Sequence, residues 1–382
     1  MIKLALKMLI GSRSFLGVIF GIFLATLLIS QQSAIFLGLV SRSYRIVTDM
    51  PLPDVWIVDP STESDEKARA MPEGYLDVVR SIPGIQWAVP LKVSNIPLVT
   101  PSGNFEIARI YGIDDATLIG APEVMLEGNI MDLHRQGAII VDTYSAHSSL
   151  AKVDADGKKI PLKIGDSFEI NNHRAVVVGI CKITQGFYPQ PIVFTTYNQF
   201  KYFTDNTQKN VEFIIAKTAS GEKIDPVLKR INAYSILNGL TSEELKWRIA
   251  KSFLKTGILI NFGLSVALGI IIGFSIAGQI FYVMTLNNLK YYALIKALGG
   301  TENKITRMIL FQVGLVGLLG FLLGIGATIV WGWAVQDTTL AFLFPWQLLL
   351  FTFFIVVLIC LFTAGLSINK VESVDPKMLM GG

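Results

Sequence analysis

The sequence predicts an α-helical membrane protein with four transmembrane helices and an α+β extracytoplasmic domain inserted between the first and second helices. Of its 382 residues, 52% are hydrophobic and 16% are charged, a composition too apolar for an ordinary water-soluble protein. Four uncharged apolar runs are each long enough to cross a bilayer. About two hundred residues of globular composition separate the first run from the other three.

The first 14 residues are expected to form a cytoplasmic amphipathic helix. Lys3 and Lys7 lie one turn apart, on the side opposite Leu6 and Leu9, so the helix could lie on the membrane surface. The apolar run 15–40 follows as the first transmembrane helix. This run is longer than the core of a signal peptide, and we therefore expect it to remain as an anchor.

Residues 41–252 are predicted to form the extracytoplasmic (periplasmic) α+β domain. Short β-rich runs indicate its strands: 54–59, 137–142, 175–180, 191–195 and 211–216. A helix is expected over 72–81 with Pro72 at its first position, and another over 224–234. The contexts of Cys181 and Cys360 differ too much for an intrachain disulfide, and Cys181 is interpreted as a small buried hydrophobe.

The remaining apolar runs complete the membrane part. The run 257–284 would be about 42 Å long as a helix, which exceeds the roughly 30 Å of the hydrocarbon core. Residues 253–285 are therefore predicted to form the second transmembrane helix, with a stalk that continues a helix starting at Glu243. The rest is expected in this order: a cytoplasmic coupling segment 286–304, a third transmembrane helix 305–335, a short external loop 336–344, a fourth helix 345–368 and a cytoplasmic tail 369–382.

The distribution of basic residues predicts the orientation. Lys290, Lys304 and Arg307 fall on the same side as the two N-terminal lysines and the C-terminal tail, and this side should be cytoplasmic. Arg42 and Lys251 lie on the other side, but long domains are translocated largely regardless of charge. Both termini are therefore predicted to be cytoplasmic.

The segment 286–304 is a polar island between two long apolar runs. Apolar residues recur on one face at helical spacing: Tyr291, Leu294, Ala297 and Leu298. Gly299 and Gly300 would end this short amphipathic helix. Thr301 can cap the next helix, with Glu302 in its first turn. An ordinary basic loop is the alternative interpretation of the same residues.

Motifs of enzymes and of ion-coupled transporters are absent from the sequence. It contains no P-loop, no His-Glu-x-x-His and no Gly-x-Ser-x-Gly. The three histidines lie apart, and Asp114-Asp115 is interpreted as a turn. No ionisable residue lies in the four apolar runs, which argues against a secondary transporter. We therefore expect no enzyme activity and no metal or cofactor in this chain.

Glycine pairs with small-xxx-small spacing occur in the predicted spans. They are Gly17 and Gly21, Gly269 and Gly273, and Gly320 and Gly324. Such pairs allow close packing of helices, within one chain or between two copies. The alternative is that glycine is simply frequent in membrane helices.

Several segments resemble FtsX-like permeases of the macrolide-exporter (MacB) type. Residues 294–301 (LIKALGGT) are similar to the family's coupling helix, which sits on an ATPase subunit. Residues 81–90 (SIPGIQWAVP) and 162–170 (LKIGDSFEI) resemble segments of its extracytoplasmic domain, and residues 370–379 resemble its basic ending. The order of spans also matches, most closely that of the stand-alone DevC-like permeases of heterocyst glycolipid exporters.

The resemblance implies the permease subunit of an ABC exporter or mechanotransmission complex in the bacterial inner membrane, with a substrate that could be lipid-like. ATP and Mg²⁺ would be bound by a partner ATPase. Its contact residues here would be Leu289, Tyr291, Leu294, Ile295, Ala297, Leu298, Gly299 and Gly300. Further implied partners are a second copy of the permease, a periplasmic adaptor (membrane fusion protein), an outer-membrane duct and membrane lipids. No basic block points to nucleic acid.

Two other classes of function remain open from the sequence. An FtsX-like or Lol-like protein could use the same topology to regulate a cell-wall hydrolase or to handle lipoproteins through its extracytoplasmic domain. That function predicts no export phenotype and a specific protein ligand. A membrane-anchored enzyme is disfavoured, because no catalytic constellation is visible.

Overall fold

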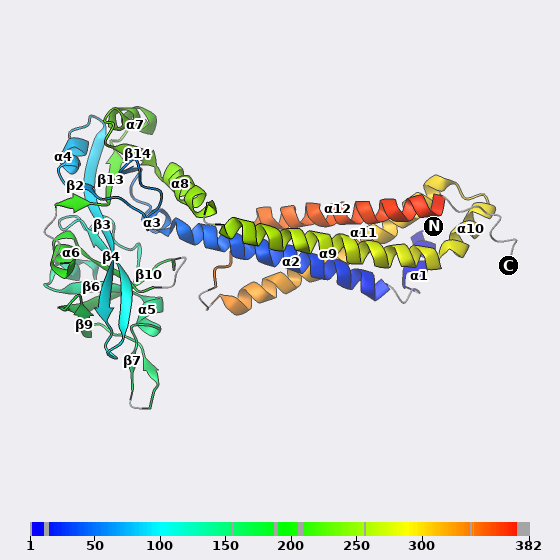
Figure 1. The fold of residues 1–382 in the computed structure, drawn as a ribbon, viewed down its shortest axis with the longest axis horizontal. Coiled ribbons are helices and arrows are strands. Elements are labelled where there is room, and N and C mark those ends of the chain that lie inside the picture. The colour runs from blue at the N-terminus through cyan, green and yellow to red at the C-terminus, as the bar shows by residue number, and fades with distance from the viewer. Residues whose placement is uncertain are drawn as a thin grey trace. The chain divides into compact units, whose positions relative to one another are not determined.

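A computed structural model describes residues 2–10, 15–154, 156–186, 190–204, 209–255, 257–336, 338 and 340–372. The chain divides into two compact units (Figure 1). Residues 40–255 form the insert domain, and residues 1–39 together with 256–382 form the membrane unit. Four of the described helices are long and apolar enough to cross a membrane, and the α+β domain lies between the first and second of them. The predicted fold class is therefore confirmed.

The insert domain is built on one large mixed sheet. Its strand order is β14-β1-β13-β3-β4-β11-β6-β10-β5, and β9 pairs with both β10 and β3. The strands are β1 Val55–Val58, β3 Ile85–Val99, β4 Phe105–Ile113, β5 Val124–Gly128, β6 Ala138–Asp142, β9 Ser167–Ile170, β10 His173–Lys182, β11 Ile192–Thr196, β13 Phe213–Thr218 and β14 Asn238–Thr241. Two small ladders accompany it, one of β2 Met71–Pro72 with β12 Asn210–Val211 and one of β7 Lys152–Val153 with β8 Lys159–Ile160.

The long strand β3 joins two halves of this sheet. Its residues 85–91 pair with β13, and its residues 92–99 pair with β4. The half on the β13 side is antiparallel, whereas the other half contains the parallel pairs β4 with β11 and β6 with β10. A strand of 15 residues is needed because it takes a different partner along each part of its length.

Helices cover both halves (Figure 1). Helices α4 Tyr75–Arg80 and α7 Ile224–Asn232 pack on β1 and β13 through one apolar cluster. Helices α5 Thr143–His147 and α6 Tyr197–Thr204 pack on β4, β6 and β10 through a second. A third cluster joins α3 Arg45–Thr48, the 3-10 helix η1 Ile130–His134 and α8 Ser242–Leu254 to both halves of the sheet. The domain therefore has a sizeable core of its own.

The predicted start of the first helix in this domain, at Pro72, is wrong. Met71 and Pro72 form β2, which pairs with Asn210 and Val211, and the helix begins at Tyr75 after Gly74. Proline is tolerated in this short two-stranded ladder because it need not donate a hydrogen bond there. Met71 is buried against the domain core, which favours strand β2 over the predicted helix at this position.

In the described part of the membrane unit, all regular secondary structure is helical. The helices are α1 Ile2–Ile10, α2 Phe15–Ser43, α9 Ile258–Asn287, α10 Leu289–Ala297, α11 Glu302–Val335 and α12 Trp346–Glu372. The segment before α12 contacts α2, since Leu343 N donates to Ala34 O at 3.0 Å. Residues 11–14 and 373–382 of the predicted cytoplasmic segments lie outside the described residues.

The paired glycines contact neighbouring helices of the same chain. A Cβ at Gly269 or Gly273 of α9 would lie 3.2 Å or less from side chains of α2, and one at Gly21 would lie 2.6 Å from Ile276 of α9. A Cβ at Gly320 or Gly324 of α11 would lie 2.7 Å or less from Ile22 or Thr26 of α2. Helix α2 is therefore held closely between α9 and α11, as small-xxx-small contacts allow.

The predicted continuous stalk is not observed. Helix α8 ends at Leu254 and α9 begins at Ile258, with Gly257 between them at φ +80°. This left-handed conformation carries no steric cost only for glycine, and it interrupts the helical hydrogen-bond ladder. A hydrophobic pattern does not register such a break, because Gly257 is simply the first residue of the apolar run 257–284.

Candidate coupling surface

The polar island of the sequence folds as α10, a helix of nine residues between α9 and α11. Asn288 precedes it, and the Asn288 amide donates to Met284 O at 3.0 Å. The same carbonyl also accepts from Asn288 N at 3.2 Å, so Asn288 caps the last turn of α9 through both its backbone and its side chain. The chain therefore changes direction at Asn288 without leaving buried polar groups unpaired.

A glycine pair ends α10 in a Schellman motif. Gly300 N donates to Ile295 O at 2.8 Å and Gly299 N donates to Lys296 O at 3.0 Å, which are the two bonds of that motif. Gly299 has φ +83°. A Cβ at Gly300 would lie 2.6 Å from Ile295 Cγ2. Both positions therefore require glycine, the first for its conformation and the second for space.

Helix α11 begins at the predicted position, but the predicted capping hydrogen bond is not formed. Thr301 has the extended conformation of an N-cap residue, yet its side chain accepts no capping hydrogen bond. Glu302 lies in the first turn of α11, and its carboxylate is 3.7 Å from Lys296 Nζ. Lys296 Nζ also donates to Val371 O of α12 at 3.3 Å. This lysine thus links the ends of three helices.

Buried side chains anchor α10 to the membrane unit. Tyr292 and Ala293 are almost fully buried, and Tyr292 OH donates to Gln312 Oε1 of α11 at 3.1 Å. Gln312 Nε2 in turn donates to Ala5 O of α1 at 2.8 Å. Burial raises the pKa of Tyr292 to about 12, so its phenol remains a hydrogen-bond donor. This chain of bonds holds α1, α10 and α11 together.

The opposite face of α10 is apolar and exposed. We call its four residues the coupling strip: Tyr291, Leu294, Ala297 and Leu298. The exposed fractions of Tyr291, Leu294 and Leu298 are 58%, 50% and 80%. Lys290 is exposed beside them. An exposed apolar strip with a basic rim is typical of a protein–protein contact.

The eight residues predicted to contact an ATPase therefore occupy three different environments. The four residues of the coupling strip are exposed. Leu289 and Ile295 are half-buried against the membrane core, and Gly299 and Gly300 form the turn. A glutamine within an apolar run, such as Gln312, is typical of hydrogen bonds between membrane helices. Sequence reasoning missed its partners, Tyr292 and Ala5, because the run does not name them.

Helix α1 also differs from the expected surface helix. Ala5 and Leu9 are fully buried, and Leu6 is exposed. The helix packs on α11 through the bond from Gln312 described above. Its apolar face therefore packs on protein, whereas the sequence pattern predicted a helix that lies on the membrane surface with its basic side toward the headgroups.

Titratable groups of the insert domain occupy structural positions. His134 bonds to the backbone oxygens of Asp115 and Met131, and Asp114 accepts from Thr117 in the predicted turn. Cys181 is fully buried and reduced, and burial raises the pKa of its thiol. Among the residues that the structure describes, no three His, Cys, Asp or Glu side chains lie close enough to hold a metal ion.

Family comparisons cover nearly the whole chain. Residues 14–234 match the MacB-like periplasmic core domain, and residues 248–376 match the FtsX-like permease C-terminal domain. The two matches meet near α8, where the structure also passes from the insert domain to the membrane unit. A search of curated proteins found no match.

Three solved structures similar to this chain are each a single region or domain of a larger protein. The periplasmic region of MacB from Actinobacillus actinomycetemcomitans is 13% identical, with a TM-score of 0.40, over 53% of this chain and 95% of that one. The extracellular domain of the ABC-type transporter YknZ from Gram-positive bacteria is 12% identical, with a TM-score of 0.36, over 50% and 99%. A domain of a permease protein from Porphyromonas gingivalis is 9% identical, with a TM-score of 0.33, over 50% and 89%.

The family matches account for both units of the molecule. The MacB-like match includes α2 and most of the insert domain, and the FtsX-like match includes α9 to α12 with the coupling strip. The chain is a multi-pass membrane protein that belongs to the FtsX-like permeases with a MacB-like periplasmic core domain, the membrane subunits of ABC-type systems.

Proposed function

We propose that this permease couples ATP hydrolysis by a separate ATPase subunit to movement of a substrate, lipid-like in character, outside the cytoplasm. The observation that carries the proposal is the coupling strip. It exposes three large apolar side chains on a short helix, and the other face of that helix is fixed to α1 and α11. A force applied to the strip would therefore reach the spans.

The proposal includes an orientation and a second copy. The termini and α10 face the cytoplasm, because basic residues gather at that end of the spans. Helix α9 exposes Ser275 and Gln279 among apolar side chains. Polar side chains on a spanning helix are more stable against another helix than against lipid, which supports pairing of two copies along α9.

The insert domain offers a surface for a periplasmic partner. Phe105 and Ile107 of β4 are 82% and 58% exposed, near the turn that joins β3 to β4. An adaptor that leads to an outer-membrane duct would bind there in an exporter. The same patch supports the second candidate function, in which the domain binds a cell-wall hydrolase or a lipoprotein.

Co-purification from native membranes tests the coupling strip. Leu294→Asp with Leu298→Asp places two carboxylates on its apolar surface and should abolish recovery of the ATPase while leaving membrane insertion intact. Phe105→Asp with Ile107→Asp is the matched control, because it makes the same change on the insert domain. The complex of the wild type and of this control should contain two copies of the permease by mass photometry.

The outcomes separate the candidate functions. An ATPase that remains bound to the strip variant would contradict the proposal. If the β4 variant retains the ATPase and secretion of envelope lipids continues, but cell-wall cleavage or lipoprotein release fails, the second function is favoured.

A further inference from the structure

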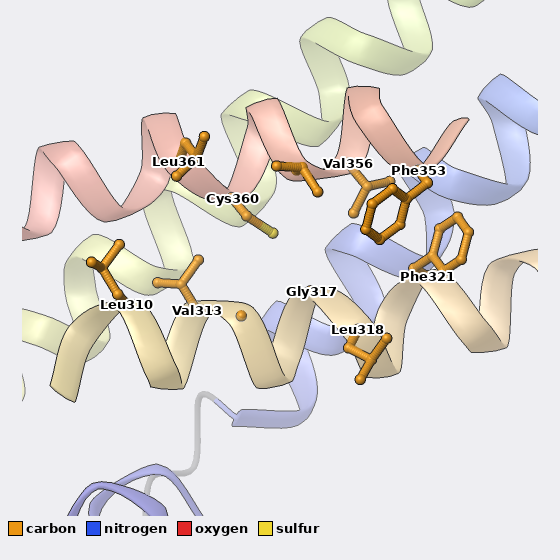
Figure 2. A pocket seen from close by; sticks show the side chains of 11 residues that line it. Leu310, Val313, Gly317, Leu318, Phe321, Phe353, Val356, Cys360 and Leu361 are labelled. Atoms are coloured by element: carbon orange, nitrogen blue, oxygen red, sulfur yellow. The ribbon is translucent and has the colours of Figure 1, made fainter. Parts of the chain in front are cut away.

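An apolar groove runs between α11 and α12 in the membrane unit (Figure 2). Its volume is about 350 Å³ and its lining is almost entirely hydrocarbon. Gly314 and Gly317 of α11 line one wall, and Cys360 of α12 faces Gly317. A Cβ at Gly317 would lie 2.4 Å from Cys360 Sγ, whereas one at Gly314 would meet no atom within 4 Å. The missing side chain at Gly314 therefore leaves the groove open.

The groove has the length of one bilayer leaflet. It extends along α11 from Leu310 to Phe321, about 16 Å at 1.5 Å per residue. Half of a hydrocarbon core about 30 Å thick is about 15 Å. Phe321 and Phe353 close the inner end in an edge-to-face contact, with ring centroids 5.5 Å apart. The opposite end lies toward the first turns of α11.

A basic side chain lies about one helical turn beyond this end of the groove. Arg307 precedes Leu310 by three residues and Gly314 by seven, so the three lie on one face of α11. Arg307 is exposed, and no carboxylate in the described parts of the chain forms a salt bridge with it. A guanidinium at the level of the headgroups can bind a phosphate through two parallel hydrogen bonds.

The dimensions select the occupant. A volume of 350 Å³ spread over about 16 Å gives a mean cross-section of about 22 Å². A helix about 10 Å in diameter needs about 80 Å². The body of a transmembrane helix from a second copy is therefore too wide to enter and would reach the groove only through its side chains, while an extended hydrocarbon chain is narrow enough to lie in it.

We propose that the groove between α11 and α12 binds one acyl chain of an anionic phospholipid, whose phosphate is bound by Arg307. The lipid belongs to the leaflet next to α10. Its acyl chain fills the space that Gly314 leaves empty, so it contributes packing between two helices that would otherwise line a void. This lipid site is independent of the ATPase contact.

Native mass spectrometry of the delipidated full-length permease, titrated with phosphatidylglycerol, tests the proposal. The wild type should bind one lipid per chain more tightly than the others. Gly314→Leu fills the groove and should weaken this binding at least tenfold. Gly326→Leu is the matched control, because Gly326 also has open space around it but does not line the groove. It should bind lipid as the wild type does.

A second pair of variants tests the phosphate contact. Arg307→Gln should weaken phosphatidylglycerol binding about tenfold, as expected for the loss of a charge-assisted bond, and should change phosphatidylcholine binding less. Lys304→Gln, which removes an equal charge one turn away, should have a smaller effect.

Two results would overturn the proposal. One is wild-type lipid binding by Gly314→Leu; if that variant also lost its second copy, a protein helix would occupy the groove. The other is wild-type phosphatidylglycerol binding by Arg307→Gln. Because the permease is measured without an ATPase, neither result depends on the coupling strip.

Discussion

The insert domain and the membrane unit bury polar side chains of different kinds. In the insert domain Lys92, Asp65, Arg109 and Asp142 are each less than 8% exposed. In the described part of the membrane unit the buried polar side chains are all uncharged, and most are threonines and serines. The insert domain, which folds in water, can bury charged side chains, whereas the described helices of the membrane unit bury only uncharged polar ones.

The difference follows from the reference state of each unit. The unfolded insert domain is surrounded by water, so burial of its apolar surface supplies a large driving force. That force can offset the cost of desolvating a few ionised groups if they are paired. Helices in lipid gain no such force from association and depend on close packing and hydrogen bonds.

The buried hydroxyls of the spans mostly bond within their own helix. Those of Thr26, Thr285, Thr352 and Thr363 each donate to the carbonyl four residues earlier, at 2.8 to 2.9 Å. Such a bond satisfies the hydroxyl whichever helices lie next to it, so it does not determine how the helices pack. Contacts at glycine, and a small number of bonds between helices, must therefore decide how the spans pack.

The largest effect is expected from the buried ion pair of the insert domain. Arg109 Nη2 donates to Asp65 O at 2.5 Å and lies 3.5 Å from Asp65 Oδ2, and its Nη1 donates to Asn95. Arg109→Met would leave the Asp65 carboxylate buried without a counter-charge, which costs about 3–5 kcal/mol. Hydrogen exchange of the β4 backbone amides in the full-length protein should show this loss in opening free energy.

The control is an ion pair on the surface of the same domain. Arg135 Nη2 lies 2.8 Å from Asp132 Oδ1, and the Arg135 side chain is largely exposed. Arg135→Met should cost at most about 1 kcal/mol. Equal losses in both variants would show that charge, and not its burial, governs the stability of this domain.

A smaller effect is expected where α2 meets α11. A Cβ at Gly324 would lie 2.5 Å from Thr26 Cβ and 3.0 Å from Phe23 O, so Gly324→Ala must push the two helices apart. We expect a loss of about 1–3 kcal/mol, as for overpacked cores. The free energy of unfolding in mixed micelles of increasing SDS content measures it.

Gly326 provides the matched position on the same helix. No atom lies within 4 Å of a Cβ built there, so Gly326→Ala should leave stability unchanged or raise it slightly through helix propensity. If Gly324→Ala is as neutral as Gly326→Ala, close packing at glycine does not hold α2 in place.

Hydrophobic length and helical spacing were sufficient to predict the spans and α10. Charged residues make up 16% of the chain and all lie outside the four apolar runs, a pattern compatible with few other folds. The Gly299-Gly300 turn forms through local hydrogen bonds alone. The exposed face of α10 also followed from the spacing of Tyr291, Leu294 and Leu298. These features depend on residues close together in the sequence.

Features that depend on distant residues could not be predicted. The bond from Gln312 to Ala5 joins residues 307 positions apart, and the burial of Met71 depends on β12. The break at Gly257 needs a backbone conformation that glycine permits but does not require. Propensity and periodicity give no information about these choices, because the first two are made by tertiary contacts and the third by the backbone conformation of one residue.

The smallest effect concerns the hydrogen bond between Ser30 of α2 and Thr328 of α11, whose hydroxyl oxygens are 2.6 Å apart. Both hydroxyls also bond carbonyls of their own helices, Ser30 to Thr26 O and Thr328 to Gly324 O. Loss of the bond between the helices therefore leaves neither group unsatisfied. A double-mutant cycle of Ser30→Ala and Thr328→Val should give a coupling free energy of about 0.6 kcal/mol, the average for such bonds in membranes.

The control cycle pairs Ser30→Ala with Thr352→Val, because the Thr352 hydroxyl donates to Leu348 O of its own helix. Its coupling should be close to zero. If the Ser30–Thr328 coupling instead approached the cost expected for Arg109→Met, hydrogen bonds would stabilise the membrane unit as strongly as buried charges stabilise the insert domain. A small coupling beside a large effect at Gly324 would assign the packing of α2 mainly to van der Waals contact.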